Sequence, residues 1–104
     1  MPTKTYAGVE VPVDDEGYLT DSSRWNREVG QAIAEELGLE LTDEHWKLID
    51  FARSDYAERG QTPGLRRMAA NTGVGMKDIY RLFPKGPGKL IAKVAGVPKP
   101  KSCI

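Results

Sequence analysis

The residue best suited to chemistry is Cys103, the only cysteine of the 104-residue chain and its penultimate residue. It follows Pro98 and Pro100, and proline can neither continue a helix nor donate a hydrogen bond to a sheet. We therefore expect residues 97–104 to form an extended, flexible C-terminal arm. At about 3.1 to 3.5 Å per residue, this arm would hold the thiol roughly 20 Å from the body, within reach of another protein's cleft.

A thiol on such an arm is typical of a cysteine that reacts. Free cysteines are usually buried as small apolar residues, and an exposed thiol is prone to oxidation. A frayed tail that happens to contain a cysteine gives the same pattern, so this alternative stays open. Lys99 and Lys101 would favour the thiolate modestly, whereas the terminal carboxylate of Ile104 opposes it. We expect Cys103 to become fully nucleophilic only inside a partner's pocket.

Other catalytic chemistry has little support in the sequence. His45 is the only histidine, and it stands in the first turn of an expected helix with no serine or cysteine near it. A hydrogen-bonded histidine without a catalytic role explains this position well. One cysteine and one histidine also argue against a zinc site or a disulfide framework. We expect no metal, no cofactor and no self-contained active site.

The chain contains the segments Gly17-Tyr18-Leu19, Trp25-Asn26, Leu41-Thr42-Asp43-Glu44-His45-Trp46, Leu82-Phe83-Pro84-Lys85-Gly86-Pro87, Ala95-Gly96-Val97-Pro98-Lys99-Pro100 and Cys103-Ile104. These segments resemble the DsrC/TusE family. The C-terminal part of the resemblance is the most specific, and the similarity covers nearly the whole chain.

This resemblance implies a small sulfur-carrier protein with Cys103 as the carrier cysteine. The family includes the gamma subunit of dissimilatory sulfite reductase and a persulfide relay in tRNA 2-thiolation. The implied partners are a sulfur-donor relay protein and a sulfur-acceptor enzyme, either a tRNA thiolase or a sulfite reductase-like enzyme. Relatives that act with sulfite reductase carry a second cysteine eleven positions earlier, where this chain has Ala92. A single thiol can hold a persulfide but cannot close an internal disulfide to discharge it.

Length and composition indicate one domain over residues 1–104, with a modest core built from 39% hydrophobic residues. No apolar run approaches the 18 or so residues of a membrane span, and the first residues lack an apolar signal region. A lone cysteine suits a reducing compartment. We expect a soluble, cytoplasmic protein that makes no membrane contact and is monomeric in its reduced state.

Charge is divided along the chain near Gly60. Residues 1–61 carry 14 acidic and 6 basic side chains, whereas residues 62–104 carry 1 acidic and 9 basic side chains. Part of this asymmetry can be used by attraction between the halves within the fold, and part can serve an acidic partner. Lysines spaced by four would form a basic stripe that continues into the arm. The expected partner-binding residues are Lys85, Lys89, Lys93, Lys99 and Lys101.

The expected fold is α+β and mainly helical. A short hairpin about Gly8 should lie against a helical body, because Val9, Val11 and Val13 alternate onto one face. Capping residues, glycines and prolines then divide the rest of the chain into helices. The expected helices run from about Asp21–Ser23 to Gly38, from the N-cap Thr42 to about Arg59, from the N-cap Thr62 to 71–73, over 74–83, and over 88–95.

Two short helices about a glycine turn, at 62–73 and 74–83, resemble a helix-turn-helix, and the added hairpin makes the whole similar to a winged DNA-binding domain. The residues expected at phosphates are Arg66, Arg67, Lys77 and Arg81. Many helical hairpins have this outline without touching DNA. Two alternative functions therefore stay open: a DNA-binding, redox-responsive regulator and an accessory subunit of a dissimilatory sulfite reductase.

Overall fold

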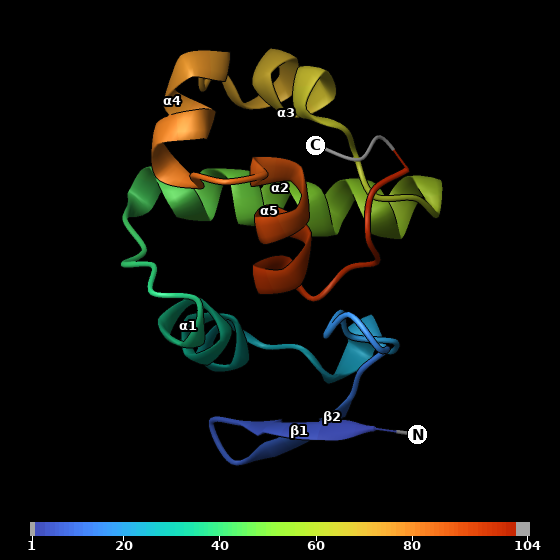
Figure 1. Ribbon diagram of the computed structural model, residues 1–104. Helices are drawn as coiled ribbons and strands as arrows, with labels where there is room; N and C mark the ends of the chain where they lie inside the picture. Colours follow the sequence, from blue (N-terminus) through green and yellow to red (C-terminus); the bar gives the residue numbers. More distant parts are fainter. Residues whose placement is uncertain (1, 102–104) are drawn as a thin grey trace.

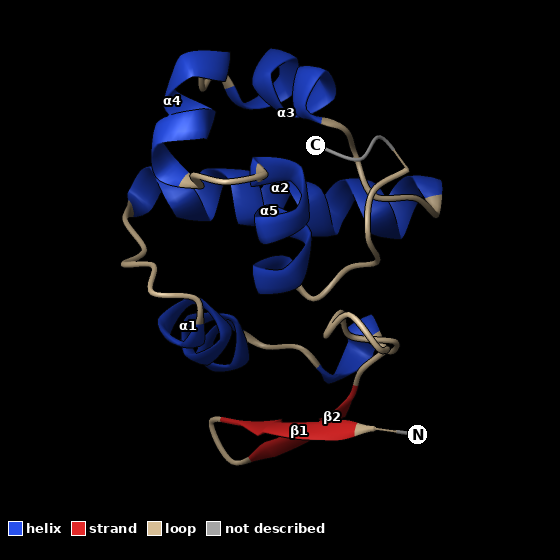
Figure 2. Ribbon diagram, in the orientation of Figure 1, coloured by secondary structure: helices blue, strands red, loops and turns tan. Residues whose placement is uncertain are grey.

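The computed structural model describes residues 2–101. Within them, two strands and five α-helices follow one another along the chain (Figure 1). A 3-10 turn, η1 (Ser22–Arg24), precedes the first helix. The elements are β1 (Thr3–Tyr6), β2 (Val9–Pro12), α1 (Arg27–Glu36), α2 (Asp43–Arg59), α3 (Leu65–Thr72), α4 (Met76–Leu82) and α5 (Pro87–Ala95). Figure 2 shows the predominance of helix, which confirms the predicted fold class.

Helix α2 is the axis of the molecule. It crosses the middle of Figure 1, with α3 and α4 on one side and α1 and the hairpin on the other. Helix α5 packs against both α2 and α1. The contact between α2 and α5 is apolar and fully buried, with Leu48, Ile49 and Ala52 on α2 and Ile91 and Val94 on α5 all at 0% exposure. None of the helices within residues 2–101 has the length and apolarity to cross a membrane.

The hairpin has a two-residue turn. Ala7 and Gly8 both have positive φ, 52° and 78°. Positive φ at both turn residues gives a turn whose twist matches that of the two antiparallel strands. The predicted alternation places Val11 and Val13 in the core, with 0% and 4% exposure. The predicted hairpin against a helical body is confirmed.

Polar contacts fix the hairpin on α1. The Lys4 ammonium and the Tyr6 hydroxyl both donate to Oε1 of Glu36, at 2.8 and 3.0 Å, near the end of that helix. The hairpin thus lies at the opposite end of the molecule from α3 and α4 (Figure 1). It does not flank those two short helices as a wing would.

The first helix begins later than the sequence predicted. Asp21 caps only the short turn η1. The backbone is then extended at Trp25, and the Asn26 side chain accepts the Val29 N–H as the N-cap of α1. The predicted start at 21–23 is wrong. Trp25 was expected on the apolar face of the first helix, but it lies before that helix, and its side chain packs against the end of α5.

The predicted N-cap at Thr62 is also wrong. Helix α3 starts at Leu65, and Gly64 is its N-cap. The Thr62 hydroxyl donates instead to the backbone oxygen of Pro98, at 2.6 Å, a partner 36 residues away that local sequence cannot reveal. The predicted bounds of α2 are confirmed, and those of α4 and α5 differ from the prediction by one or two residues.

A buried carboxylate joins α2 to α3. Asp55 is 4% exposed, and Arg67 donates to both of its oxygens, at 3.0 and 2.8 Å. Arg59 contributes a further ion pair at 3.5 Å. The hydrogen bonds from Arg67 hold the pKa of Asp55 below its ordinary value. A bidentate pair of this kind fixes orientation as well as distance.

The end of α5 is packed against Trp25. Gly96 follows the helix with φ of 69°, the left-handed conformation that glycine adopts without strain. A Cβ at Gly96 would lie 2.5 Å from Cδ1 of Trp25, and a Cβ at Gly30 would lie 2.7 Å from its Cζ2. The indole therefore fits between two glycines, and its Nε1–H donates to the Val94 carbonyl at 2.7 Å.

We expect Gly96→Ala to lower the free energy of unfolding by about 2 to 4 kcal/mol. The substitution combines a left-handed alanine with overlap on Trp25. Gly73→Ala is the matched control, because Gly73 ends α3 at φ of 77° with no atom within 4 Å of the added Cβ. Its cost should be about 1 kcal/mol, from the backbone alone. Urea unfolding followed by circular dichroism measures both, and equal losses would contradict the packing of Trp25 on Gly96.

We expect Arg67→Gln to lower the midpoint of thermal unfolding and Arg66→Gln to leave it unchanged. Arg67 balances a buried carboxylate, whereas Arg66 is exposed and bonds to nothing within residues 2–101. The difference should be full above the ordinary carboxyl pKa of about 3.9 and should shrink as the pH falls through the lower folded pKa of Asp55. Calorimetry from pH 7 to pH 2.5 tests this, and equal midpoints at pH 7 would show that the pair contributes nothing.

Candidate functional site

The predicted reactive residue, Cys103, lies outside the described residues. The segment that leads to it from α5, residues 97–101, is described and is here named the strap. It has no helix or strand, as Pro98 and Pro100 predicted. In Figure 1 the chain turns at the end of α5 and runs back beside α2 toward α3.

The strap lies against the body, whereas the sequence predicted a free arm from Val97 onward. Val97 is 1% exposed, and its N–H donates to the Ala92 carbonyl at 3.1 Å. Pro100 is also buried. Proline cannot join regular hydrogen-bonded structure, but it still buries apolar surface, and the prediction took account only of the first property.

Two polar contacts hold the middle of the strap. The Thr62 hydroxyl donates to the Pro98 carbonyl, and the Lys99 ammonium pairs with Glu16 at 3.1 Å. The Lys99 and Glu16 side chains are 34% and 58% exposed, so water and salt screen this pair. The positive charge expected to favour the thiolate is therefore partly offset at Lys99.

The predicted lysines do not form one helical stripe. Lys85 precedes α5 and has φ of 67°, so only Lys89 and Lys93 lie on that helix. The Lys93 ammonium lies 5.2 Å from the centre of the Tyr18 ring. Lys101 is exposed at the end of the strap. Their binding to a partner remains a prediction.

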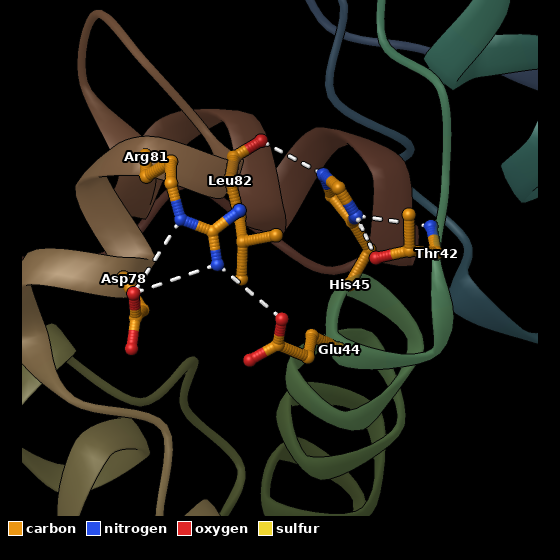
Figure 3. A network of polar contacts seen from close by, with 6 residues as sticks. All are labelled: Thr42, Glu44, His45, Asp78, Arg81 and Leu82. Atoms are coloured by element: carbon orange, nitrogen blue, oxygen red, sulfur yellow. Dashed lines mark hydrogen bonds and ion pairs between the residues drawn. The ribbon is translucent and has the colours of Figure 1, made fainter.

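The residues predicted to contact phosphates divide into two pairs. Arg67 is bonded to Asp55, and Arg81 is bonded to Glu44 and Asp78 at 3.3 and 3.4 Å (Figure 3). The remaining two, Arg66 and Lys77, are exposed and bond to no side chain or backbone group within residues 2–101. Contact with nucleic acid remains a prediction for all four.

His45 has a structural position. It is 6% exposed, and its Nδ1 accepts the Thr42 N–H at 3.0 Å, which leaves the proton on Nε2 (Figure 3). Nε2 donates to the Leu82 carbonyl at 2.9 Å, and the ring makes a T-shaped contact with the Phe83 ring, with the ring centres 4.9 Å apart. His45 thereby joins the start of α2 to the end of α4. Both ring nitrogens are used within the fold, as expected of a hydrogen-bonded histidine.

Arg53 is a site residue that was not predicted, and it lies where the chain leaves α5 for the strap. Its Nη1 donates to the Ala95 carbonyl at 2.8 Å, and its Nη2 donates to the Ser22 carbonyl at 3.2 Å. The available signal was its spacing, since position 53 shares a helix face with Ile49 and Tyr56. A charged residue on an apolar face indicates a buried polar contact. Within residues 2–101, no group of three or more metal-ligating side chains gathers.

Comparisons with known proteins cover the whole fold. The Sulfurtransferase TusE of Escherichia coli strain K12 is 42% identical over 106 aligned residues, which cover 95% of this chain and 97% of the relative. The same protein of Salmonella typhimurium is 41% identical with the same coverage. The crystal structure of the oxidized gamma-subunit of the dissimilatory sulfite reductase (DsrC) from Archaeoglobus fulgidus has a TM-score of 0.86 at 32% identity, over 99% of this chain and 100% of that one.

A solution structure agrees with these matches. Allochromatium vinosum DsrC has a TM-score of 0.85 at 37% identity, over 98% of this chain and 97% of that one. The family model described as DsrC like protein matches residues 5–104. The match includes the hairpin from Thr5 onward, the five helices, the strap and the C-terminal cysteine, and the chain therefore belongs to the DsrC-like family.

Proposed function

We propose that this protein is a sulfur carrier that accepts a sulfur atom on Cys103 and passes it to a partner. The observation that carries the proposal is the similarity to Sulfurtransferase TusE, which extends over 95% of the chain at 42% identity. Cys103 is the only thiol in the chain, so a covalent sulfur carrier of this sequence has one place to hold its cargo.

The chemistry is thiol exchange. The Cys103 thiolate attacks the outer sulfur of a donor persulfide, a new S–S bond forms on Cys103, and the donor's S–S bond breaks to release the donor thiolate. In the second step a nucleophile of the acceptor attacks the outer sulfur now on Cys103. The S–S bond breaks, and Cys103 leaves as a thiolate. The sulfur is never released as free sulfide.

The lone thiol determines how the cargo leaves. Ala92, where two-cysteine relatives carry their second thiol, is 0% exposed on α5. No internal thiol can discharge the persulfide on Cys103, so the acceptor must do so. This supports an acceptor such as a tRNA thiolase over a sulfite reductase-like enzyme that uses a two-cysteine cycle. The donor would be a second relay protein, and a cytoplasmic location would keep the thiol reduced.

The strap permits delivery because its middle is weakly held. The bond between the Thr62 hydroxyl and the Pro98 carbonyl contributes about 1 kcal/mol, and the exposed pair between Lys99 and Glu16 contributes well under about 1 kcal/mol. Separation of the chain beyond Val97 therefore costs these two polar contacts and the burial of Pro100, all of which a partner's cleft can replace. A strap of this kind stays close to the fold until a partner's cleft offers better contacts.

We expect Cys103→Ser to abolish sulfur loading and to leave thermal stability nearly unchanged. The test incubates the purified protein with a cysteine desulfurase, its relay protein and cysteine, and then measures intact mass. The wild type should gain one sulfur atom on the peptide that holds Cys103, and the serine variant should gain none. Loading of the serine variant would place the site elsewhere, and loss of its folding would indicate that the C-terminal residues are structural.

We expect Thr62→Val to release the middle of the strap. The substitution keeps the side chain's shape and removes the hydroxyl that bonds Pro98. Backbone hydrogen exchange at the Lys99 and Lys101 amides should become faster, since Pro98 and Pro100 have no amide hydrogen, and transfer from the relay protein to Cys103 should rise. Thr3→Val, at an exposed position of β1, is the control and should change neither. Slower transfer by Thr62→Val would mean that the docked strap is the form a partner recognises.

A further inference from the structure

The carbonyl end of α5 receives side-chain donors from two distant segments. The Arg53 guanidinium, in the middle of α2, donates to Ala95 of α5 and to Ser22 of η1. Its Cζ lies 4.1 Å from the centre of the Trp25 ring, and that indole donates to Val94. One stacked pair of side chains therefore joins α2, η1 and α5 at a single point.

This arrangement leaves the last turn of α5 fully satisfied. A helix ends with four backbone carbonyls that lack a partner within the helix. At α5, the first two of them accept N–H groups of Gly96 and Val97, as in other helices that end at a left-handed glycine. The other two, of Val94 and Ala95, accept side-chain donors from Trp25 and Arg53. The turn cannot fray without breaking the bonds from Trp25 and Arg53.

Arg53 is unusual in what balances its charge. It is half-buried, and burial lowers the pKa of its guanidinium, although the charge of Asp50 opposes this. Within residues 2–101 its hydrogen bonds go only to backbone carbonyls, and one of these, of Ala95, lies at the negative end of the α5 dipole. A guanidinium can bond two carbonyls of different segments at fixed angles, whereas a lysine ammonium is a point charge.

We infer that Arg53 is a positioning residue for sulfur transfer, because it fixes the place and direction at which the chain leaves α5 toward Cys103. The inference rests on the proposed function. The C-terminal residues leave the body at Gly96, so the positions that the thiol can reach depend on where this point lies. A displaced or fraying end of α5 would change those positions. Misplacement of a reacting group by about 1 Å can slow a reaction by about 100-fold.

The chain contains a matched control for Arg53. Arg27 stacks on Trp46 with its Cζ 3.9 Å from the ring centre, and it pairs with Asp50 at 3.5 Å. It therefore shares the stacking of a guanidinium on an indole. It donates no hydrogen bond to α5 or to the strap within residues 2–101. Its loss removes a stacked guanidinium and none of the side-chain hydrogen bonds to the end of α5.

The test compares Arg53→Gln, Arg53→Lys and Arg27→Gln by two measurements at a temperature well below unfolding. The first is hydrogen exchange at the Val97 amide, followed by nuclear magnetic resonance, which needs no sulfur chemistry. The second is the rate of sulfur transfer from a persulfide-loaded relay protein to Cys103 as the donor concentration is varied. Alkylation of Cys103 by iodoacetamide is measured in parallel to report intrinsic thiol reactivity.

Both Arg53 variants should lose about tenfold in protection at the Val97 amide, as expected when local opening becomes easier by one hydrogen bond. Half-maximal transfer should need about fivefold more of the persulfide-loaded relay protein. A helix end without a fixed position lowers the effective concentration of the Cys103 thiol in the partner's cleft. Iodoacetamide should react at the wild-type rate. Arg27→Gln should match the wild type in all three measurements.

Other outcomes would overturn the inference. Wild-type Val97 protection and wild-type donor dependence in Arg53→Lys, whatever its thermal stability, would make Arg53 a stabilising residue only. Equal defects in Arg27→Gln would have the same meaning. If Arg53→Gln does not fold, Arg53→Lys decides, since it keeps the charge and the aliphatic stem. If the wild type accepts no sulfur, the proposed function fails, and the Val97 amide still shows whether Arg53 fixes the helix end.

Discussion

The structure depends on how the carbonyl end of α5 is satisfied inside the fold. Buried backbone oxygens need hydrogen-bond donors from the protein, and the end of a packed helix has several such oxygens close together. Here Trp25 and Arg53 supply the donors, so the segment before α1 and the middle of α2 meet at the last turn of α5. Gly30 and Gly96 leave the space that the indole fills. The contacts that close the core thus also set the path of the chain toward its C-terminal end.

The division of charge along the sequence is used in the same way. Ion pairs in the described part of the chain join an acid from the first 61 residues to a base from the rest, among them Asp55 with Arg67, Glu44 with Arg81, and Glu16 with Lys99. The first is at a buried carboxylate and fixes α3 on α2, whereas the other two are exposed and weaker. Attraction between the halves therefore accounts for part of the asymmetry. The cations without a bond in residues 2–101, such as Lys77 and Lys89, remain available to a partner.

Local signals in the sequence predicted the elements whose ends are decided locally. Helix α2 has a threonine before it and a left-handed glycine after it, and its predicted bounds are confirmed. Prediction failed at Asp21 and Thr62, which have the residue types of N-caps but different roles: one caps only a short turn, and the other bonds a carbonyl far along the chain. Arg53 escaped prediction because its partners are backbone oxygens, which carry no residue-type signature. The lack of regular structure in the strap followed from its prolines, but its burial depends on a surface that only the folded chain provides.

The hold on the chain weakens stepwise from α5 outward, and this gradient suits a carrier with one thiol. Val94 and Ala95 are bonded to Trp25 and Arg53, and Val97 is buried, so this part is firmly fixed. Further along, the Thr62 hydroxyl, an exposed ion pair and the burial of Pro100 contribute to holding the strap, and a partner can replace each of these contacts. A carrier that must give its sulfur to an external nucleophile needs both properties. The firmly held end of α5 fixes where the strap leaves the body, and the weaker contacts of its middle let a partner draw the strap away without first disturbing the core.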